Sequence, residues 1–142
     1  MKKKKYISPY RRGIKDCDLL WSFIIKARAN WRCELVGKDH IRCTDVMQAA
    51  HLYTRGVPKI RHDLRNGKCL CSGHHVWYTM NEHAWQEVCN KVWGEDYRDL
   101  NLYRQIVTKP DIGLIFQVLK IEAKQYELPE NANKRLRELI GG

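Results

Sequence analysis

Apolar residues recur along the chain with spacings that predict several helices and one short pair of strands. Residues 16–29 carry apolar side chains at helical spacing, which predicts a helix capped by Asp16. Residues 46–53 and 68–71 are short and mostly apolar, which predicts two strands. The segment between them contains glycine and proline and is predicted to be a loop.

The chain after the second strand is predicted to be mainly helical. One helix should start at Ser72, and Asn81 should cap another that runs to about Trp93 and stops at Gly94. Residues 33–43 are polar and predict a compact loop. Further helices are predicted over 95–107, 111–126 (capped by Asp111) and 130–140. The predicted fold class is therefore α+β, with the order strand, loop, strand, helix inside a mainly helical single domain.

The charge of the chain points to a polyanionic partner. Its 142 residues fit one domain, and 26 Lys+Arg against 16 Asp+Glu give a net charge of +10. DNA, RNA and an anionic membrane all satisfy this charge. The basic run 2–5 is either a solvated tail or an arm that contacts phosphates. No apolar run is long enough to span a bilayer, and the basic run lacks the following apolar region of a secretory signal. The expected location is therefore cytoplasmic.

The six cysteines are interleaved with histidines, which favours metal binding over disulfides. Cys33, Cys43, Cys71 and His74 are predicted to form a structural zinc site, since thiolates and imidazole suit tetrahedral Zn²⁺. The pair Cys71-x-x-His74 has suitable spacing, whereas Cys69 competes with Cys43 for the remaining position. The alternative is a set of small buried thiols without a metal. Cys17 and Cys89 fall on predicted helices and are expected in the core.

One ordered set of residues resembles a known enzyme family. Ala49-Ala50-His51-Leu52 is followed by Asn66 and then by Cys71-Ser72-Gly73-His74-His75. Over roughly residues 16–94 this order resembles the HNH endonucleases (His-Me finger, ββα-metal), particularly the small phage-type enzymes. The resemblance implies a ββα-metal core with a structural zinc knuckle.

The resemblance also implies roles for individual residues. His51 would be the general base, Asn66 would orient it through the backbone, and His75 would hold a catalytic Mg²⁺ or Mn²⁺ ion. Many relatives carry a second metal ligand just before the base, where this chain has Ala50. The remaining expectations concern side chains around the loop: Arg55 and Arg61 as phosphate contacts or else solvated charges, and His40, His62 and His83 as surface residues.

The implied function is a metal-dependent DNA endonuclease that hydrolyses phosphodiester bonds in phage recombination or DNA processing, similar to NinG-like nucleases. The implied organisation is a basic tail (1–15), a nuclease core (16–94) and a helical extension (95–142). Apolar faces in 95–126 could support a homodimer. If the protein is phage-encoded, its location would be the host cell cytoplasm. The alternatives are a non-catalytic, zinc-stabilised nucleic-acid-binding module and, less favoured, a regulatory or assembly protein that binds through its helices.

Overall fold

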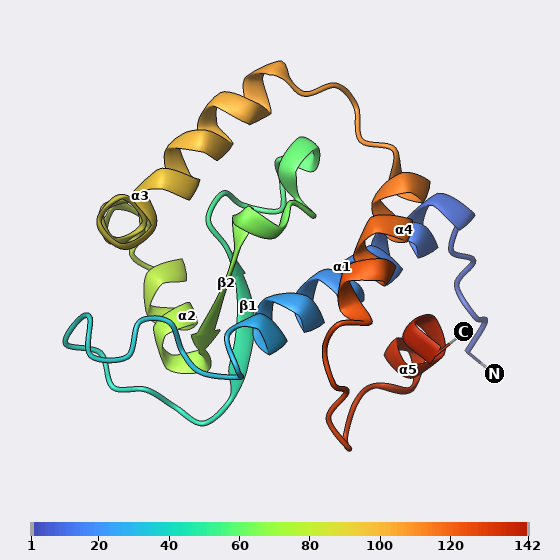
Figure 1. Ribbon diagram of the computed structural model, residues 1–142, viewed down its shortest axis with the longest axis horizontal. Helices are drawn as coiled ribbons and strands as arrows, with labels where there is room; N and C mark the ends of the chain where they lie inside the picture. Colours follow the sequence, from blue (N-terminus) through green and yellow to red (C-terminus); the bar gives the residue numbers. More distant parts are fainter. Residues whose placement is uncertain (1, 142) are drawn as a thin grey trace.

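The computed structural model describes residues 2–141 and shows a helical protein built around one small sheet (Figure 1). Helix α1 crosses the middle of the molecule, with the strands, α2 and α3 on one side and α4 and α5 on the other. The elements are α1 (Pro9–Arg28), β1 (Met47–His51), β2 (Gly67–Cys71), α2 (Ser72–Thr79), α3 (Glu82–Ile106), α4 (Ile112–Ala123) and α5 (Lys134–Gly141), with short 3₁₀ turns η1 (Pro58–Ile60) and η2 (Leu64–Asn66).

The two strands pair antiparallel, in the order that the apolar pattern predicts. Ala49 lies opposite Cys69 and His51 lies opposite Gly67. A long loop, residues 52–66, joins the strands, and α2 follows β2 directly. All five residues of β2 are buried, because helices cover both of its faces. The predicted α+β class and the strand, loop, strand, helix order are both confirmed.

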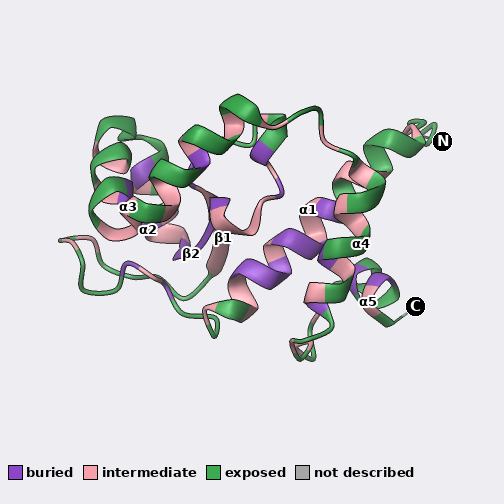
Figure 2. Cartoon of the chain, turned by 45° about the horizontal axis from the view of Figure 1, so that its top comes forward, coloured by how far each residue is buried: buried purple, intermediate pink, exposed green. Residues whose placement is uncertain are grey.

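Helix α1 is the centre of the main core. Its buried side chains contact the sheet on one side and the apolar faces of α4 and α5 on the other. Figure 2 shows this as a run of buried positions along α1 and the strands, while much of α3 and α4 faces solvent. The core members are Cys17, Leu20, Trp21, Phe23, Ile24 and Ile25 of α1, with Cys69, Leu119, Ala123, Leu136 and Leu139.

The predicted start of the first helix is wrong. The helix begins at Pro9, where Ser8 Oγ accepts a hydrogen bond from the Arg11 backbone N–H at 3.3 Å. A serine cap followed by proline in the first helical position is a favourable start, because proline lacks only an N–H that would be unpaired anyway. Asp16 lies inside the helix, where its carboxylate pairs with Arg135 of α5 at 2.9 Å. Residues 9–15, expected in the basic tail, therefore belong to α1.

The break predicted near Gly94 is confirmed in part. The backbone at Trp93, with φ of −125° and ψ of 38°, is not helical, and two helical segments meet there at a bend, although α3 as a whole continues to Ile106. Lys68 of β2 reaches Asp96 just beyond the bend, with Nζ 2.9 Å from the carboxylate. The bend lets both halves of α3 contact the rest of the molecule instead of projecting past it. The predicted cap of α4 is also confirmed, since Asp111 accepts from the Leu114 N–H at 3.1 Å.

Within residues 2–141, no helix has both the length and the apolar character needed to cross a bilayer.

A substitution at Gly67 tests the packing of α1 on the sheet. A Cβ at this position would lie 2.6 Å from Trp21 Cζ2 and would also meet the side chain of Ile25. We expect Gly67→Ala to lower the free energy of unfolding by about 1–3 kcal/mol, the usual cost of overpacking. Urea unfolding measures this change. The control is Gly113→Ala on α4, where the new Cβ has room and stability should hold or rise slightly; equal stability of both variants would contradict the packing described.

Candidate functional site

Three cysteines and one histidine converge at the junction of β2 and α2. Cys33 and Cys43 come from the loop before β1, Cys71 ends β2, and His74 lies in the first turn of α2. The His74 Nδ1 atom lies 3.7, 3.6 and 3.0 Å from the three Sγ atoms, in chain order. Ligands of tetrahedral zinc at standard bond lengths stand roughly 3.6 Å apart for sulfur and nitrogen. The cluster could therefore hold a metal ion such as zinc.

The surroundings orient His74 for this role. Its Nε2 atom lies 2.8 Å from Asp39 Oδ1, and Tyr78 donates to the other carboxylate oxygen at 2.7 Å. A carboxylate behind a ligating imidazole fixes the ring and raises its basicity. Burial raises the pKa of Cys71, but hydrogen bonds from His74 and Thr44 outweigh it and lower that pKa to about 6. A thiol that ionises this easily is suited to bind a cation.

Cys43, and not Cys69, completes the group, which decides the question that the sequence left open. Cys69 is buried on the α1 side of the sheet, and its N–H donates to Glu34 Oε2 at 2.6 Å. Burial raises the pKa of Cys69 to about 11, so its thiol stays protonated. Cys17 and Cys89 are fully buried away from the cluster, as expected of core residues.

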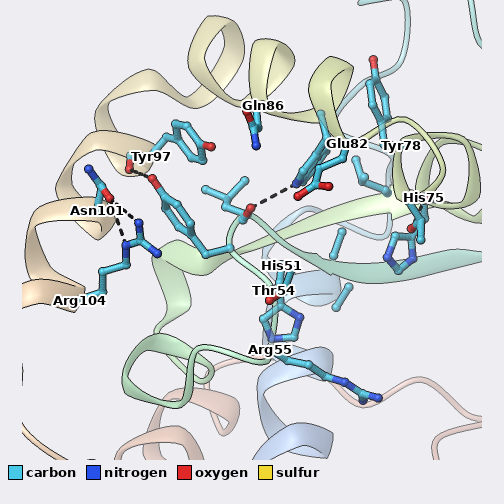
Figure 3. A pocket seen from close by; sticks show the side chains of 17 residues that line it. His51, Thr54, Arg55, His75, Tyr78, Glu82, Gln86, Tyr97, Asn101 and Arg104 are labelled. Atoms are coloured by element: carbon cyan, nitrogen blue, oxygen red, sulfur yellow. Dashed lines mark hydrogen bonds between the residues drawn. The ribbon is translucent and has the colours of Figure 1, made fainter.

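An open cleft of about 960 Å³ lies between β1, the loop after it, α2 and α3 (Figure 3). His51 and His75, both predicted site residues, line it together with Arg55 and Glu82. Ala50 forms part of the floor and is buried. The cleft therefore brings together two histidines from separate elements.

His51 is held in one tautomer. Its Nε2 atom lies 3.0 Å from the carbonyl oxygen of Arg61, and a carbonyl can only accept, so Nε2 carries the proton. The ring stacks on Trp21 with centroids 4.0 Å apart and planes 12° apart. Burial lowers the pKa of His51 to about 4, although the Arg61 carbonyl opposes the change. The imidazole is consequently neutral near pH 7, with its lone pair on Nδ1.

Asn66 closes the loop that carries the Arg61 carbonyl. Its fully buried amide accepts from the Tyr53 N–H at 2.8 Å and donates to the Tyr53 and Ile60 carbonyls, each at 3.1 Å. The Asn66 backbone carbonyl also accepts from the Leu52 N–H at 3.0 Å. One side chain thus joins the chain just after His51 to the residue just before Arg61, the backbone contact that the sequence suggested for it.

Helix α1 holds the same loop from the other side. Asp18 accepts from the Arg61 guanidinium at 2.6 and 3.0 Å and pairs with His62 at 2.7 Å. The expectation that His62 is a surface residue is wrong, because its hydrogen bond with Asp18 satisfies the buried ring. The Arg61 side chain, expected on phosphate, is engaged by Asp18 in the structure. Burial raises the pKa of Asp18, but the hydrogen bonds from His62 and Arg61 outweigh this effect and lower that pKa to about 2.

His75 and Arg55 offer different groups to the cleft. His75 Nδ1 lies 2.7 Å from Gln48 Oε1; with the amide oxygen accepting, the lone pair of His75 is on Nε2. Burial lowers the pKa of His75, which keeps the ring neutral and able to ligate a metal. Arg55 is exposed on the loop and forms none of the ion pairs among residues 2–141.

Comparison with protein-family models, with curated proteins and with solved structures gave no match for this chain.

Four residues that orient the site were not anticipated from the sequence. Each acts on a partner distant along the chain, so spacing gave no sign of the pair. Asp18 and Gln48, polar residues in otherwise apolar stretches of the predicted helix and strand, were the available signals. These residues are Asp18, Trp21, Asp39 and Gln48.

The metal assignment can be tested with two cysteine variants. Purified protein should contain about one zinc per chain, and Cys43→Ser should lower both zinc content and melting temperature. Cys69→Ser, the matched control, should keep its zinc because that thiol lies outside the cluster. Elemental analysis after gel filtration measures the content. If well-folded wild-type protein contains no zinc, the four residues are buried thiols and a histidine without a metal.

The protonation of His51 can be followed directly by NMR. In the folded protein about one tenth of His51 should be protonated at pH 5, because its pKa lies near 4; an ordinary imidazole would be almost fully protonated. The contribution of the neutral ring to the free energy of unfolding is complete above pH 6.5, the ordinary pKa of histidine. It is lost as the pH falls from 6.5 to about 4, because the unfolded chain then binds a proton that the folded protein does not. The ring carbon and proton shifts between pH 7.5 and 5 report the titration, with His51→Gln for assignment. A midpoint near 6.5 would disprove the buried, neutral state.

Proposed function

We propose that this protein is a metal-dependent DNA endonuclease of the HNH type. The main support is the state of His51, which lines an open cleft. Its imidazole is neutral and donates Nε2–H to a backbone carbonyl. Within residues 2–141 every buried side-chain nitrogen of a residue that is not exposed has a hydrogen-bond partner. The Nδ1 atom of His51 has none there, so it is not buried and can meet water. The β1–β2–α2 order with a metal cluster beside it is what a ββα-metal core requires, and supports the same proposal.

His51 is suited to be the general base on water. Nδ1 can accept a proton, and the Arg61 carbonyl then stabilises the imidazolium through the hydrogen bond that it already accepts. Trp21 prevents the ring from rotating out of the cleft. Asn66 and Asp18 keep the Arg61 carbonyl in place by holding the loop on both sides. These contacts require no rearrangement when the proton moves.

A catalytic cation would bind at His75. Nε2 is the nitrogen left free when Gln48 accepts from Nδ1, and Glu82 adds a carboxylate to the same cleft. This donor set fits a divalent ion that takes its other ligands from water and phosphate. When bound, Mg²⁺ or Mn²⁺ would neutralise charge that develops on the scissile phosphate. Gln48 contributes by fixing the His75 ring.

DNA is the polyanion that we propose as the substrate. The net charge of +10 favours any nucleic acid, and Arg55 places a guanidinium on the rim of the cleft beside His51. An arginine there suits bidentate contact with a phosphate. Two identical active sites in a homodimer would permit paired cuts, and the cytoplasm would give access to DNA.

One observation favours the alternative, a zinc-stabilised nucleic-acid-binding module without catalysis. The position before His51 is Ala50, which is 2% exposed and offers no ligand atom. A cation would then have His75 as its one imidazole ligand, and metal affinity would be low. The binding module predicts wild-type protein that binds DNA yet cuts nothing with any divalent ion.

The deciding experiment is a cleavage assay on a panel of DNA structures. Supercoiled plasmid, linear duplex, flap, four-way junction and single strand are each incubated with Mg²⁺, Mn²⁺ or EDTA. We expect metal-dependent cutting by the wild type and a loss of about 100- to 10,000-fold in His51→Ala, the usual effect of removing a general base. His75→Ala should also lose activity, and raised Mn²⁺ should restore part of it.

The control variant is His83→Ala. His83 is an exposed histidine on α3 that pairs with Glu87, so its loss should leave cleavage unchanged. Zinc content, melting temperature and DNA affinity of His51→Ala are measured in parallel to show that the variant is folded. Cleavage by His51→Ala at the wild-type rate would refute the assignment of the base. If the folded wild type never cleaves, the non-catalytic nucleic-acid-binding module remains as the function.

A further inference from the structure

A layered stack of side chains stands at the α3 end of the cleft, away from His75 (Figure 3). The rings of Tyr53 and Tyr97 stack with centroids 4.7 Å apart and planes 6° apart. The Arg104 guanidinium lies over the Tyr53 ring, 4.8 Å from its centroid. Asn101 Oδ1 accepts from Arg104 Nε and Nη2 at 3.0 and 2.9 Å. The guanidinium is therefore fixed in position from two directions.

The Tyr53 ring is itself a rigid support. Its hydroxyl donates to the Tyr97 carbonyl at 2.9 Å, and its backbone N–H and C=O are both bonded to Asn66. Burial and the neighbouring Tyr97 raise the pKa of Tyr53 to about 12, so the phenol keeps the proton that it donates. Arg104 thus rests on the residue that lies two positions after His51.

The charge of Arg104 is not neutralised. Asn101 is a neutral partner, and Arg104 forms none of the ion pairs within residues 2–141. Its Nη1 atom forms no hydrogen bond there. Every buried side-chain nitrogen of the partly exposed residues in this range has a hydrogen-bond partner, so the unpaired Nη1 atom is not buried. The Asn101 amide nitrogen is accessible for the same reason. Every free polar group of this pair is a donor, which suits an anion.

A second arginine shows what a neutralised version looks like. Arg65 also lies over a tyrosine ring, 5.1 Å from the centroid of Tyr103. Its partner is the carboxylate of Asp63, which accepts from Nε and Nη2 at 3.0 and 2.8 Å. Both arginines stack on a tyrosine ring and donate from Nε and Nη2, Arg104 to the single amide oxygen of Asn101 and Arg65 to the two carboxylate oxygens of Asp63. They differ in that Asn101 leaves the positive charge of Arg104 available to a ligand.

We propose that Arg104 and Asn101 form a binding site for a backbone phosphate of the nucleic acid, separate from the phosphate attacked beside His51. A planar guanidinium that is already oriented loses little entropy when it binds a phosphate. With Nε and one N–H of Nη2 held by Asn101, Nη1 and the second N–H of Nη2 remain as donors. This proposal rests on the proposed nucleic-acid role of the cleft. It means that the nucleic-acid strand passes over the α3 end of the cleft. Since Asn66 fixes both Tyr53 and the loop of His51, the second phosphate sets where the strand crosses the base.

The test measures binding in EDTA, where no cleavage occurs. A short fluorescent duplex is titrated with wild type, Arg104→Gln and Asn101→Asp over a series of salt concentrations. Each lost phosphate contact should reduce the slope of log affinity against log salt by about 0.9. We expect that reduction in Arg104→Gln. Asn101→Asp should give the same reduction, because it supplies Arg104 with the carboxylate that Arg65 already has.

Two matched variants serve as controls. Arg65→Gln removes a stacked arginine whose charge is already paired, and Asn90→Asp adds the same negative charge at an exposed position of α3 outside the cleft lining. Both should keep the wild-type slope. Melting temperatures verify that all variants fold. Inorganic phosphate is added as a competitor: weak competition at millimolar concentration supports a backbone phosphate, whereas tight binding of free phosphate with no change in duplex slope would overturn the proposal.

The outcome is independent of catalysis. A wild-type slope in both Arg104→Gln and Asn101→Asp would overturn the phosphate site even if the protein cuts DNA. A reduced slope in these variants would support the site even if the wild type never cleaves, and the endonuclease proposal alone would then fail.

Discussion

The closure of the loop between β1 and β2 by Asn66 is the interaction on which the site depends. A loop of this length has many conformations, and its closure costs entropy that grows with length. A buried amide with three backbone bonds offsets part of that cost and selects one conformation. The selected loop holds the Arg61 carbonyl against His51 and the Tyr53 ring beneath Arg104. The proposed base and the proposed phosphate site therefore share one rigid support.

The cluster of Cys33, Cys43, Cys71 and His74 has the corresponding role for the segment before β1. Residues 30–46 contain no helix or strand, so few backbone hydrogen bonds fix their conformation. Cys33 and Cys43 tie this segment to the end of β2 and the start of α2. Cys71 serves three purposes, since it ends the strand, caps the helix by accepting from the His74 N–H, and belongs to the cluster. A bound ion would thus fix the segment to β2 and to α2, the helix that contains His75.

The sequence was most informative where structure is local. Both strands, the helix after β2 and the Asp111 cap depend on neighbouring residues, and the pattern predicts them. The cluster followed from ligand types and spacing, although the choice of Cys43 over Cys69 needed the packing of the sheet on α1. Contacts between distant segments were not predictable. Asp18 buries His62 from 44 positions away, and Arg104 reaches Tyr53 only because α3 bends and returns over the loop.

The partners of the charged and titratable groups follow a division that agrees with the proposed roles. Groups that hold the fold together have carboxylate partners: Arg61 and His62 with Asp18, Arg65 with Asp63, and His74 with Asp39. Groups that line the cleft have neutral ones: His51 with the Arg61 carbonyl, His75 with Gln48, and Arg104 with Asn101. A carboxylate paired with His51 or Arg104 would repel a phosphate at that position, and at Arg104 it would also neutralise the arginine. Burial lowers the pKa of His51 to about 4, which is low for a base at neutral pH, and the Arg61 carbonyl opposes this change only in part. A phosphate beside the ring favours the charged imidazolium and raises that pKa. In the proposed reaction, His51 therefore becomes a stronger base when the substrate binds.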